Sequence, residues 1–130
     1  MIIYLSEEQI LFTHSRLIAE TGGSHGVRDV GLLKSAIARP MATFDGVDLY
    51  PDLFLKTAAL MASLAQNRPF VDGNKRIATT SASMFLLQNG RFLSTTNPEM
   101  VRFTHWVVEQ KPPLDKIADW FQLNSKETAY

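Results

Sequence analysis

Residues 52–88 read DLFLKTAALMASLAQ (52–66), NRPFVDG (67–73) and NKRIATTSASMFLLQ (74–88), and they contain the two most apolar segments of the chain. Residues 53–65 are apolar almost all round a helix with 3.6 residues per turn, which is typical of a helix buried on most sides. Asp52 is expected to begin this helix. Residues 74–88 form a second core helix, which Asn89-Gly90 is expected to close. The pattern predicts two buried helices joined by a short polar loop.

Two more helices are expected before this pair. The pattern Ser6–Gln9 is typical of a capping box, so the first helix is expected to start at Ser6 and to stop at Gly22-Gly23. Its apolar face is expected to consist of Ile10, Leu11, His14, Leu17 and Ile18. Asp29 is expected to cap a second helix that ends at Pro40.

Two further helices are expected after the pair. Asn97 suits the cap of a fifth helix and Pro98 suits its first turn. Pro112-Pro113 would end that helix, and a sixth would cover about residues 114–123.

Short β-structure is expected at two places. Residues 41–50 contain Asp45-Gly46, a hairpin turn signal, between short apolar pieces, which predicts a small β-flap. Ile2–Leu5 and Arg91–Leu93 are expected to pair as a minor strand ladder. The whole pattern predicts an all-α fold of about six helices with one short β-flap.

The composition favours one soluble domain spanning residues 1–130. Lysine and arginine number 13, as do aspartate and glutamate, and this zero formal charge argues against direct nucleic-acid binding, which needs a clustered basic surplus. The absence of cysteine excludes disulfides and thiolate metal sites. Neither a signal-peptide pattern nor an apolar stretch of membrane-spanning length is found. We therefore expect a cytoplasmic protein with no membrane partner.

The loop between the two core helices has the chemistry of an anion site. Gly73 allows a ligand to approach the backbone closely, and Asn74 begins a helix whose free N–H groups favour phosphate. Lys75 and Arg76 lie in the first turn of that helix, where positive charge opposes the helix dipole, so a functional demand is indicated. Asp72 supplies a hard oxygen ligand beside the phosphates, as is usual for Mg²⁺. Phe70 is expected to anchor the loop in the core. The plain alternative is that Asp72-Gly73 is an ordinary turn beside solvated surface charges.

Pro69-Phe70-Val71-Asp72-Gly73-Asn74-Lys75-Arg76 resembles the signature of the Doc (death-on-curing) branch of the Fic superfamily, which reads His-x-Phe-x-Asp/Asn-Gly/Ala-Asn-Lys-Arg. The resemblance extends over most of the chain. The other positions that look like those of the Doc family are His14, residues 22–29, Leu32-Leu33, residues 38–40, Tyr50-Pro51 and Asn67. It implies a six-helix fold with a flap, in agreement with the periodicity.

The resemblance also implies an activity and a set of partners. Asp72 would help to hold Mg²⁺, and Gly73, Asn74, Lys75 and Arg76 would bind the phosphates of ATP. Members of the Doc branch resemble kinases that transfer the terminal phosphate of ATP to a threonine of elongation factor Tu. That transfer halts translation and arrests growth. A Phd-type antitoxin silences these toxins, so it is an expected partner. Asp72, Lys75, Arg76 and the residue at position 68 would form the catalytic set.

This chain departs from the signature at Arg68, which stands where the family has histidine. The family histidine is the general base that takes the proton from the attacking hydroxyl, and its pKa near neutrality suits that task. Arginine stays protonated and cannot accept the proton. Arg68 is either a substitution that allows a lethal gene to be carried in a host or the mark of a natural non-catalytic relative. The catalytic activity of this chain is therefore expected to be impaired.

Two other functions stay open. The Fic branch transfers AMP, but its pattern reads Gly-Asn-Gly-Arg-x-x-Arg, and this chain has Lys75 and Thr79 in place of the second glycine and the second arginine. A non-catalytic module that engages an antitoxin or regulator is the other alternative.

Several residues outside the loop have two interpretations. His14 is expected to be a hydrogen-bonded core histidine, whereas His25 could approach the site. Arg28 and Asp29 are interpreted as a loop ion pair and a cap, with Arg28 on the substrate side as the alternative. The flap could clamp a target peptide by strand addition or be an ordinary surface loop. Four residues are interpreted as core aromatics: Phe103, Trp106, Trp120 and Phe121.

Overall fold

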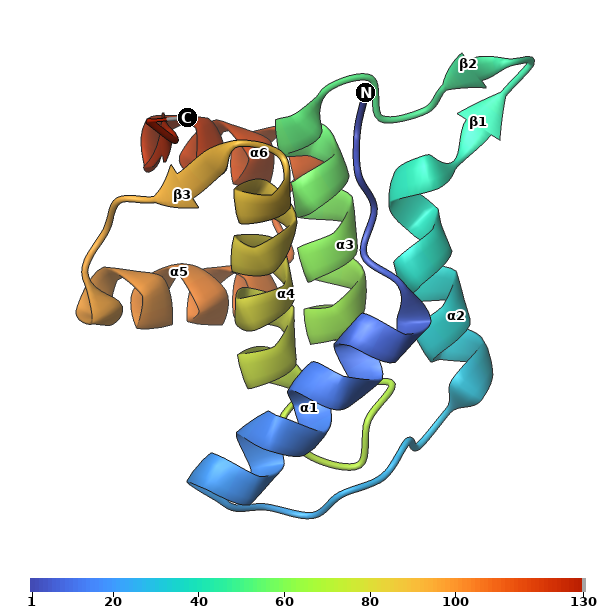
Figure 1. The fold of residues 1–130 in the computed structure, drawn as a ribbon, viewed down its shortest axis with the longest axis vertical. Coiled ribbons are helices and arrows are strands. Elements are labelled where there is room, and N and C mark those ends of the chain that lie inside the picture. The colour runs from blue at the N-terminus through green and yellow to red at the C-terminus, as the bar shows by residue number, and fades with distance from the viewer. Residues whose placement is uncertain (130) are drawn as a thin grey trace.

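Two antiparallel helices, α3 (Leu53–Asn67) and α4 (Asn74–Gln88), form the centre of the molecule in the computed structural model, which describes residues 1–129. α3 is enclosed on nearly all sides, as its apolar sequence predicts, and every residue from Lys56 to Ala65 is buried. Asp52 caps α3 by accepting a hydrogen bond from the Leu55 N–H. Figure 1 shows α3 and α4 running through the middle of the structure, with the other helices packed around them.

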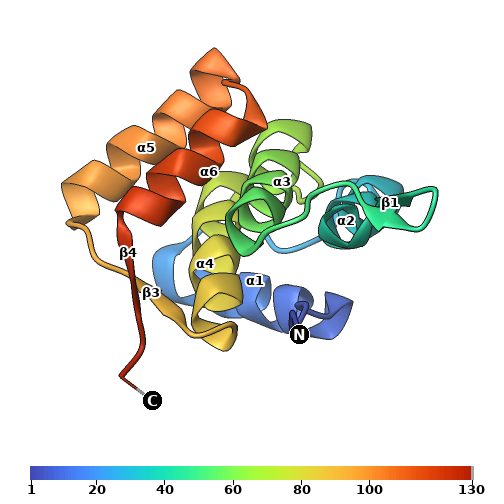
Figure 2. The same cartoon turned by 90° about the horizontal axis from the view of Figure 1, so that it is seen from above.

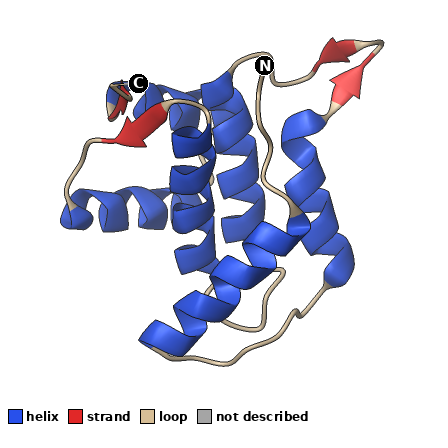
Figure 3. Cartoon of the chain, in the orientation of Figure 1, coloured by secondary structure: helices blue, strands red, loops and turns tan. Residues whose placement is uncertain are grey.

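The remaining elements surround this pair. The helices are α1 (Glu7–Thr21), α2 (Val30–Ala38), α5 (Asn97–Gln110) and α6 (Leu114–Leu123), with a 3₁₀ helix, η1 (Arg39–Met41), after α2. The short strands are β1 (Thr43–Phe44), β2 (Val47–Asp48), β3 (Arg91–Leu93) and β4 (Ser125–Glu127). Figure 2 shows α5 and α6 side by side along one flank of α3 and α4. Figure 3 shows that strands contribute only short pairs at the periphery, so the predicted all-α class with a short flap is confirmed.

The predicted start of α1 is confirmed in detail. Ser6 Oγ accepts from the Gln9 N–H, and the Gln9 side chain accepts from the Ser6 N–H, which completes the capping box. The buried residues of α1 are Ile10, His14 and Ile18. Leu11, which the sequence pattern places on the same face, is 37% exposed. The buried face of α1 is therefore narrower than predicted.

Two predictions about the C-terminal half are wrong. Asn97 is not the cap of α5, because Thr96 has the extended backbone of a cap and its Oγ accepts from the Glu99 N–H. Residues 91–93 do not pair with residues 2–5, because β3 pairs with β4 in the antiparallel register Arg91↔Glu127, Phe92↔Lys126 and Leu93↔Ser125.

The N-terminal segment is held by a side chain instead of a strand. The Asn89 amide receives a hydrogen bond from the Ile3 N–H and donates one to the Ile3 carbonyl. These two hydrogen bonds satisfy the backbone N–H and carbonyl of Ile3, which would otherwise need partners in a strand ladder.

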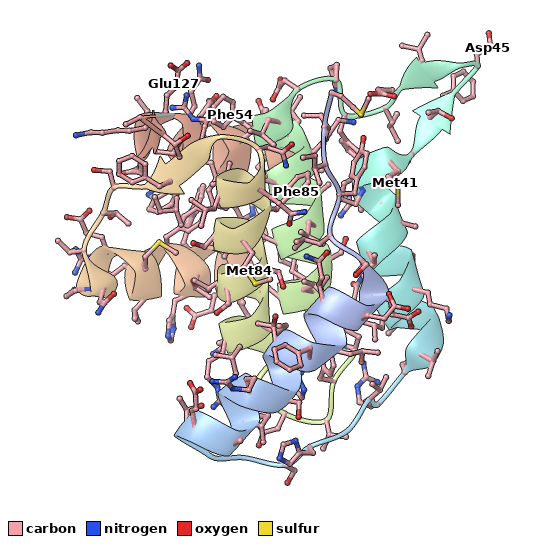
Figure 4. All side chains as sticks on the ribbon, viewed as in Figure 1. Met41, Asp45, Phe54, Met84, Phe85 and Glu127 are labelled. Carbon is pink, nitrogen blue, oxygen red and sulfur yellow. The ribbon has the colours of Figure 1, made fainter. Side chains whose placement is uncertain are left out.

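The β-flap formed by β1 and β2 lies at the N-terminal end of α3. Figure 4 marks its tip at Asp45, pointing away from the helices. Lys56, which is 1% exposed, donates to Asp48 Oδ2 at 3.0 Å and to the Pro40 carbonyl at 3.1 Å, and so ties the flap and η1 to α3.

The aromatic residues of α5 and α6 pack together as predicted. Phe103 and Phe121 are buried, Trp106 and Trp120 are partly buried, and the Phe103 and Trp120 rings stack with centroids 3.7 Å apart.

Within residues 1–129, no helix is long and apolar enough to cross a membrane.

Candidate functional site at the N-terminus of helix α4

The loop that joins α3 to α4 is anchored by one aromatic side chain and one amide. Phe70 is buried, as predicted. Asn74, at the first turn of α4, accepts a hydrogen bond from the Phe70 N–H at 3.0 Å and donates one to the Phe70 carbonyl at 3.0 Å. These two bonds close the loop onto the helix that follows it. We call residues 67–76 the signature loop.

The N-terminus of α4 is left open. Gly73 occupies the cap position with φ 75° and ψ 20°, and no side chain caps the helix there. The first backbone N–H groups of a helix have no intrahelical partner, so those of Asn74, Lys75 and Arg76 are directed outward from the helix end. Among the described α-helices, α1, α2, α3 and α5 have a side-chain cap, whereas α4 and α6 do not, and only the uncapped end of α4 has Lys75 and Arg76 in its first turn.

All the predicted site residues line one cavity of about 300 Å³ at this helix end. Its lining consists of Ala65, Arg68, Asp72, Gly73, Asn74, Lys75, Arg76 and Val108. A second hollow of about 290 Å³ adjoins it, because Lys75 and Arg76 line both, and extends between α4 and α5. Because the side chain of Asn74 is hydrogen-bonded to the backbone of Phe70, Asn74 would contribute to anion binding through its backbone N–H.

The Asp72 carboxylate is held ionised by its surroundings. Hydrogen bonds from the backbone N–H groups of Ser24 (3.2 Å) and Gly73 (3.0 Å) lower the pKa of Asp72 below its ordinary value, and the nearby charge of Arg76 acts in the same direction. Within the described residues, no group of three or more His, Asp or Glu side chains could hold a metal ion alone. A Mg²⁺ ion at Asp72 would therefore need phosphate oxygens and water to complete its coordination, which is how Mg²⁺ usually binds in proteins.

His14 is buried, as predicted, and holds the signature loop from α1. Its Nε2 donates to the Asp72 carbonyl at 2.7 Å, and its ring stacks on Phe70 with centroids 3.7 Å apart. Burial lowers the pKa of His14 below its usual value, and the positive charge of Arg76 lowers it further. Sequence analysis placed His14 in the core but missed its contact with the loop, because nothing in the pattern of α1 shows which segment lies against it.

The residues that follow α1 lie along the signature loop. We call residues 22–29 the strap. The Val71 N–H donates to the Gly26 carbonyl at 3.0 Å, the Arg28 N–H donates to the Pro69 carbonyl at 2.7 Å, and Val27 forms an antiparallel bridge with Phe70. In Figure 1 the two segments run together beneath α3 and α4.

Two arginines connect these segments, because each donates hydrogen bonds to the C-terminal end of the helix that precedes the other segment. Arg76 donates to the Gly22 carbonyl at 3.0 Å and to Thr21 Oγ1, at the C-terminus of α1. Arg28 donates to the carbonyls of Arg68 (2.7 Å) and Asn67 (2.8 Å), at the C-terminus of α3. The predicted cap at Asp29 is confirmed, because its Oδ1 accepts from the Leu32 N–H at the start of α2. The predicted loop ion pair of Arg28 is wrong for the part of the chain described, because its side chain donates to backbone carbonyls at the end of α3 instead. Positive groups at helix C-termini are favourable, because they meet the negative end of the helix dipole.

Arg68 lies where α3 ends. It has φ 51° and ψ 61°, the left-handed conformation, and its exposed side chain borders the cavity. Histidine is among the non-glycine residues that adopt this conformation most often. The backbone at position 68 is therefore suited to the histidine that the signature has there.

The flap is at the other end of α3 from this cavity. Lys56 holds Asp48 of the flap near the N-terminus of α3, whereas the signature loop begins at its C-terminus. A helix of 15 residues is about 22 Å long, so the flap does not border the cavity. This placement favours the surface-loop interpretation of the flap.

Fold and site together define a class of protein. Proteins of this class are mostly helical, and a polar loop joins two of their buried helices. This loop lines a cavity at the open N-terminus of the second helix, and positive side chains border the cavity. Residues 4–86 of the chain match the model of the Fic/DOC family. The chain belongs to the Fic/Doc family and, by its relatives, to the Doc branch.

Two relatives carry that assignment. The chain is 51% identical over 90 residues to the toxin Doc of Mycolicibacterium smegmatis (strain ATCC 700084 / mc(2)155), covering 69% of this chain and 67% of that protein. It is 29% identical over 116 residues to the protein kinase doc of Escherichia phage P1, covering 89% of this chain and 90% of that protein.

Proposed function

We propose that this chain is a Doc-type toxin whose single domain transfers the terminal phosphate of ATP to a threonine of elongation factor Tu, and that Arg68 impairs the transfer. Similarity to proteins named toxin Doc and protein kinase doc supports the general activity. The observation that carries the proposal is the cavity at the open N-terminus of α4, where Lys75, Arg76 and an ionised Asp72 meet.

The residues of this cavity fit a nucleotide with Mg²⁺. The free N–H groups of Asn74, Lys75 and Arg76 offer hydrogen bonds to phosphate oxygens, and the side chains of Lys75 and Arg76 offer positive charge. Asp72 offers a carboxylate that stays ionised at neutral pH. ATP would supply the phosphoryl group, and Mg²⁺ would neutralise part of its charge.

Position 68 determines whether the chain can activate its substrate. A neutral histidine there would accept the proton of the threonine hydroxyl, whereas the Arg68 guanidinium is always protonated. Arg68 would instead hold a phosphate in a non-productive complex. Loss of a positioned base typically lowers the rate by about 10²–10⁴-fold.

Reversion of Arg68→His tests the proposal. The revertant is expected to arrest bacterial growth and to label purified elongation factor Tu from ATP that carries label in its terminal phosphate. The matched control is Arg68→His combined with Asp72→Asn, which keeps the base but removes the proposed Mg²⁺ ligand, and it should not label. A growth-neutral revertant that labels nothing would refute the proposal, and label from the α-phosphate would instead identify an AMP transferase.

A Phd-type antitoxin is the expected partner. Co-expression of such an antitoxin should abolish the growth arrest caused by the revertant. If antitoxin binding persists while Arg68→His has no effect on growth or labelling, the chain is a non-catalytic binding module.

A further inference from the structure

The strap, residues 22–29, contacts the two charged side chains of the proposed site. The Ser24 N–H donates to Asp72 Oδ2 at 3.2 Å. Arg76, which lies four residues after Asp72 in the signature loop, donates to the Gly22 carbonyl at 3.0 Å. The strap therefore fixes the orientation of a carboxylate and a guanidinium that lie about 50 residues further along the chain.

Gly23 lies against both of these groups. A Cβ atom at this position would be 2.7 Å from Asp72 Oδ2 and 3.2 Å from Arg76 Nη2. The first distance is closer than side-chain carbon atoms approach an oxygen, so any other residue at position 23 would displace the Asp72 carboxylate. No other described glycine outside the signature loop approaches the site side chains in this way.

We infer that the strap positions Asp72 and Arg76 for the Mg²⁺-nucleotide complex, with Gly23 and the Ser24 N–H as its positioning groups. This inference rests on the proposed function, because it assigns the strap a role at that same site. The strap itself touches no reacting atom. It acts through the Ser24 N–H, which donates to Asp72 Oδ2, while the Gly73 N–H of the signature loop donates to Asp72 Oδ1. Asp72 held in this way lines the cavity.

The adjacent glycine provides a matched control. Gly22 and Gly23 have φ angles of 89° and 109°, so alanine is strained at either position. A Cβ at Gly22 would meet nothing within 4 Å, whereas a Cβ at Gly23 meets Asp72 and Arg76. The difference between Gly22→Ala and Gly23→Ala therefore isolates contact with the site from backbone strain.

The first measurement is the affinity for ATP in the presence of Mg²⁺, by calorimetric titration of the full chain. Loss of a group that orients a metal ligand typically weakens metal binding by about 10–100-fold, and we expect a loss of this size for Gly23→Ala. Gly22→Ala should keep most of the parent affinity. Equal affinities for the two variants would overturn the inference.

A second pair of variants tests the hydrogen bond without adding bulk. Ser24→Ala keeps the backbone N–H, and Ser24→Pro removes it. Only Ser24→Pro should lose Mg²⁺-dependent affinity, and unchanged binding by a folded Ser24→Pro variant would contradict the role of the donor. This pair remains informative if Gly23→Ala fails to fold, because position 24 is exposed.

A spectroscopic measurement separates this inference from the proposed function. In ¹H–¹⁵N spectra without nucleotide, Asp72→Asn should shift the amide resonances of both Ser24 and Gly73, because each donates to that side chain. If these shifts occur but no variant or parent binds ATP, the strap contact stands while both the proposed function and the positioning role fail. If ATP binds but Ser24 is unaffected by Asp72→Asn, the inference alone fails.

Discussion

Replacing Asn74 with alanine should destabilise the protein by removing the two hydrogen bonds that close the signature loop. Asn74 is 7% exposed, and its side chain forms hydrogen bonds with the N–H and the carbonyl of Phe70, each at 3.0 Å. A hydrogen bond contributes about 0.5–1.5 kcal/mol net, and a buried partner left unsatisfied costs about 1–3 kcal/mol. Because Phe70 is buried and both of its backbone groups lose their partner, we expect a loss of about 2–4 kcal/mol in the free energy of unfolding.

Urea denaturation and thermal unfolding would measure this loss. For a chain of this length each kcal/mol corresponds to about 4 °C in Tm, so Tm should fall by roughly 8–16 °C. The matched control is Asn97→Ala, because Asn97 is exposed and, in the part of the chain described, its side chain makes no hydrogen bond. Its effect should stay within about 0.5 kcal/mol. Equal stability of Asn74→Ala and Asn97→Ala would refute the reasoning that the loop is closed by this amide.

Other residues give predictions of the same kind. Burial holds the pKa of His14 in the folded state below its ordinary value of 6.5, so the unfolded state binds more protons as the pH falls below 6.5. Stability should therefore fall as the pH drops below 6.5, and His14→Gln should flatten this dependence in urea titrations at several pH values. Lys56→Met should lower the free energy of unfolding by about 1–2 kcal/mol and speed proteolysis of the flap, because Asp48 loses its partner. The exposed control Lys34→Met should change stability by less than about 0.5 kcal/mol, and equal proteolysis rates for the two variants would contradict the role of Lys56. Arg28→Lys should destabilise by about 1 kcal/mol, because lysine cannot reproduce the two-pronged cap on α3, and an unchanged Tm would argue against that cap.

The sequence predicted most of the helical architecture because its signals are local. The capping box at Ser6, the cap at Asp52 and the breaks at Gly22-Gly23 and Pro112-Pro113 all lie at observed helix ends. The clustering of Arg68 with Asp72–Arg76 followed from their closeness in the chain. The error at Asn97 arose because two neighbouring residues can both cap a helix, and only the backbone conformation of Thr96 decides between them.

The contacts that the sequence missed are all between distant segments. β3 pairs with β4 because the C-terminal segment returns to it after α6, and no pattern in residues 91–93 specifies that partner. The roles of His14, Arg28 and the strap depend on which loops meet beneath α3 and α4. Helix propensity and periodicity describe single elements, so they could not indicate that two loops about 45 residues apart form one site.

In the proposed function, the open N-terminus of α4 binds the phosphates of ATP together with Mg²⁺. The most direct test is to titrate the ¹⁵N-labelled chain with a non-hydrolysable ATP analogue and to follow its amide resonances with and without Mg²⁺. We predict saturable shifts centred on Gly73, Asn74, Lys75 and Arg76 that weaken when Mg²⁺ is removed. Absence of saturable shifts, or shifts confined to another surface, would contradict the claim.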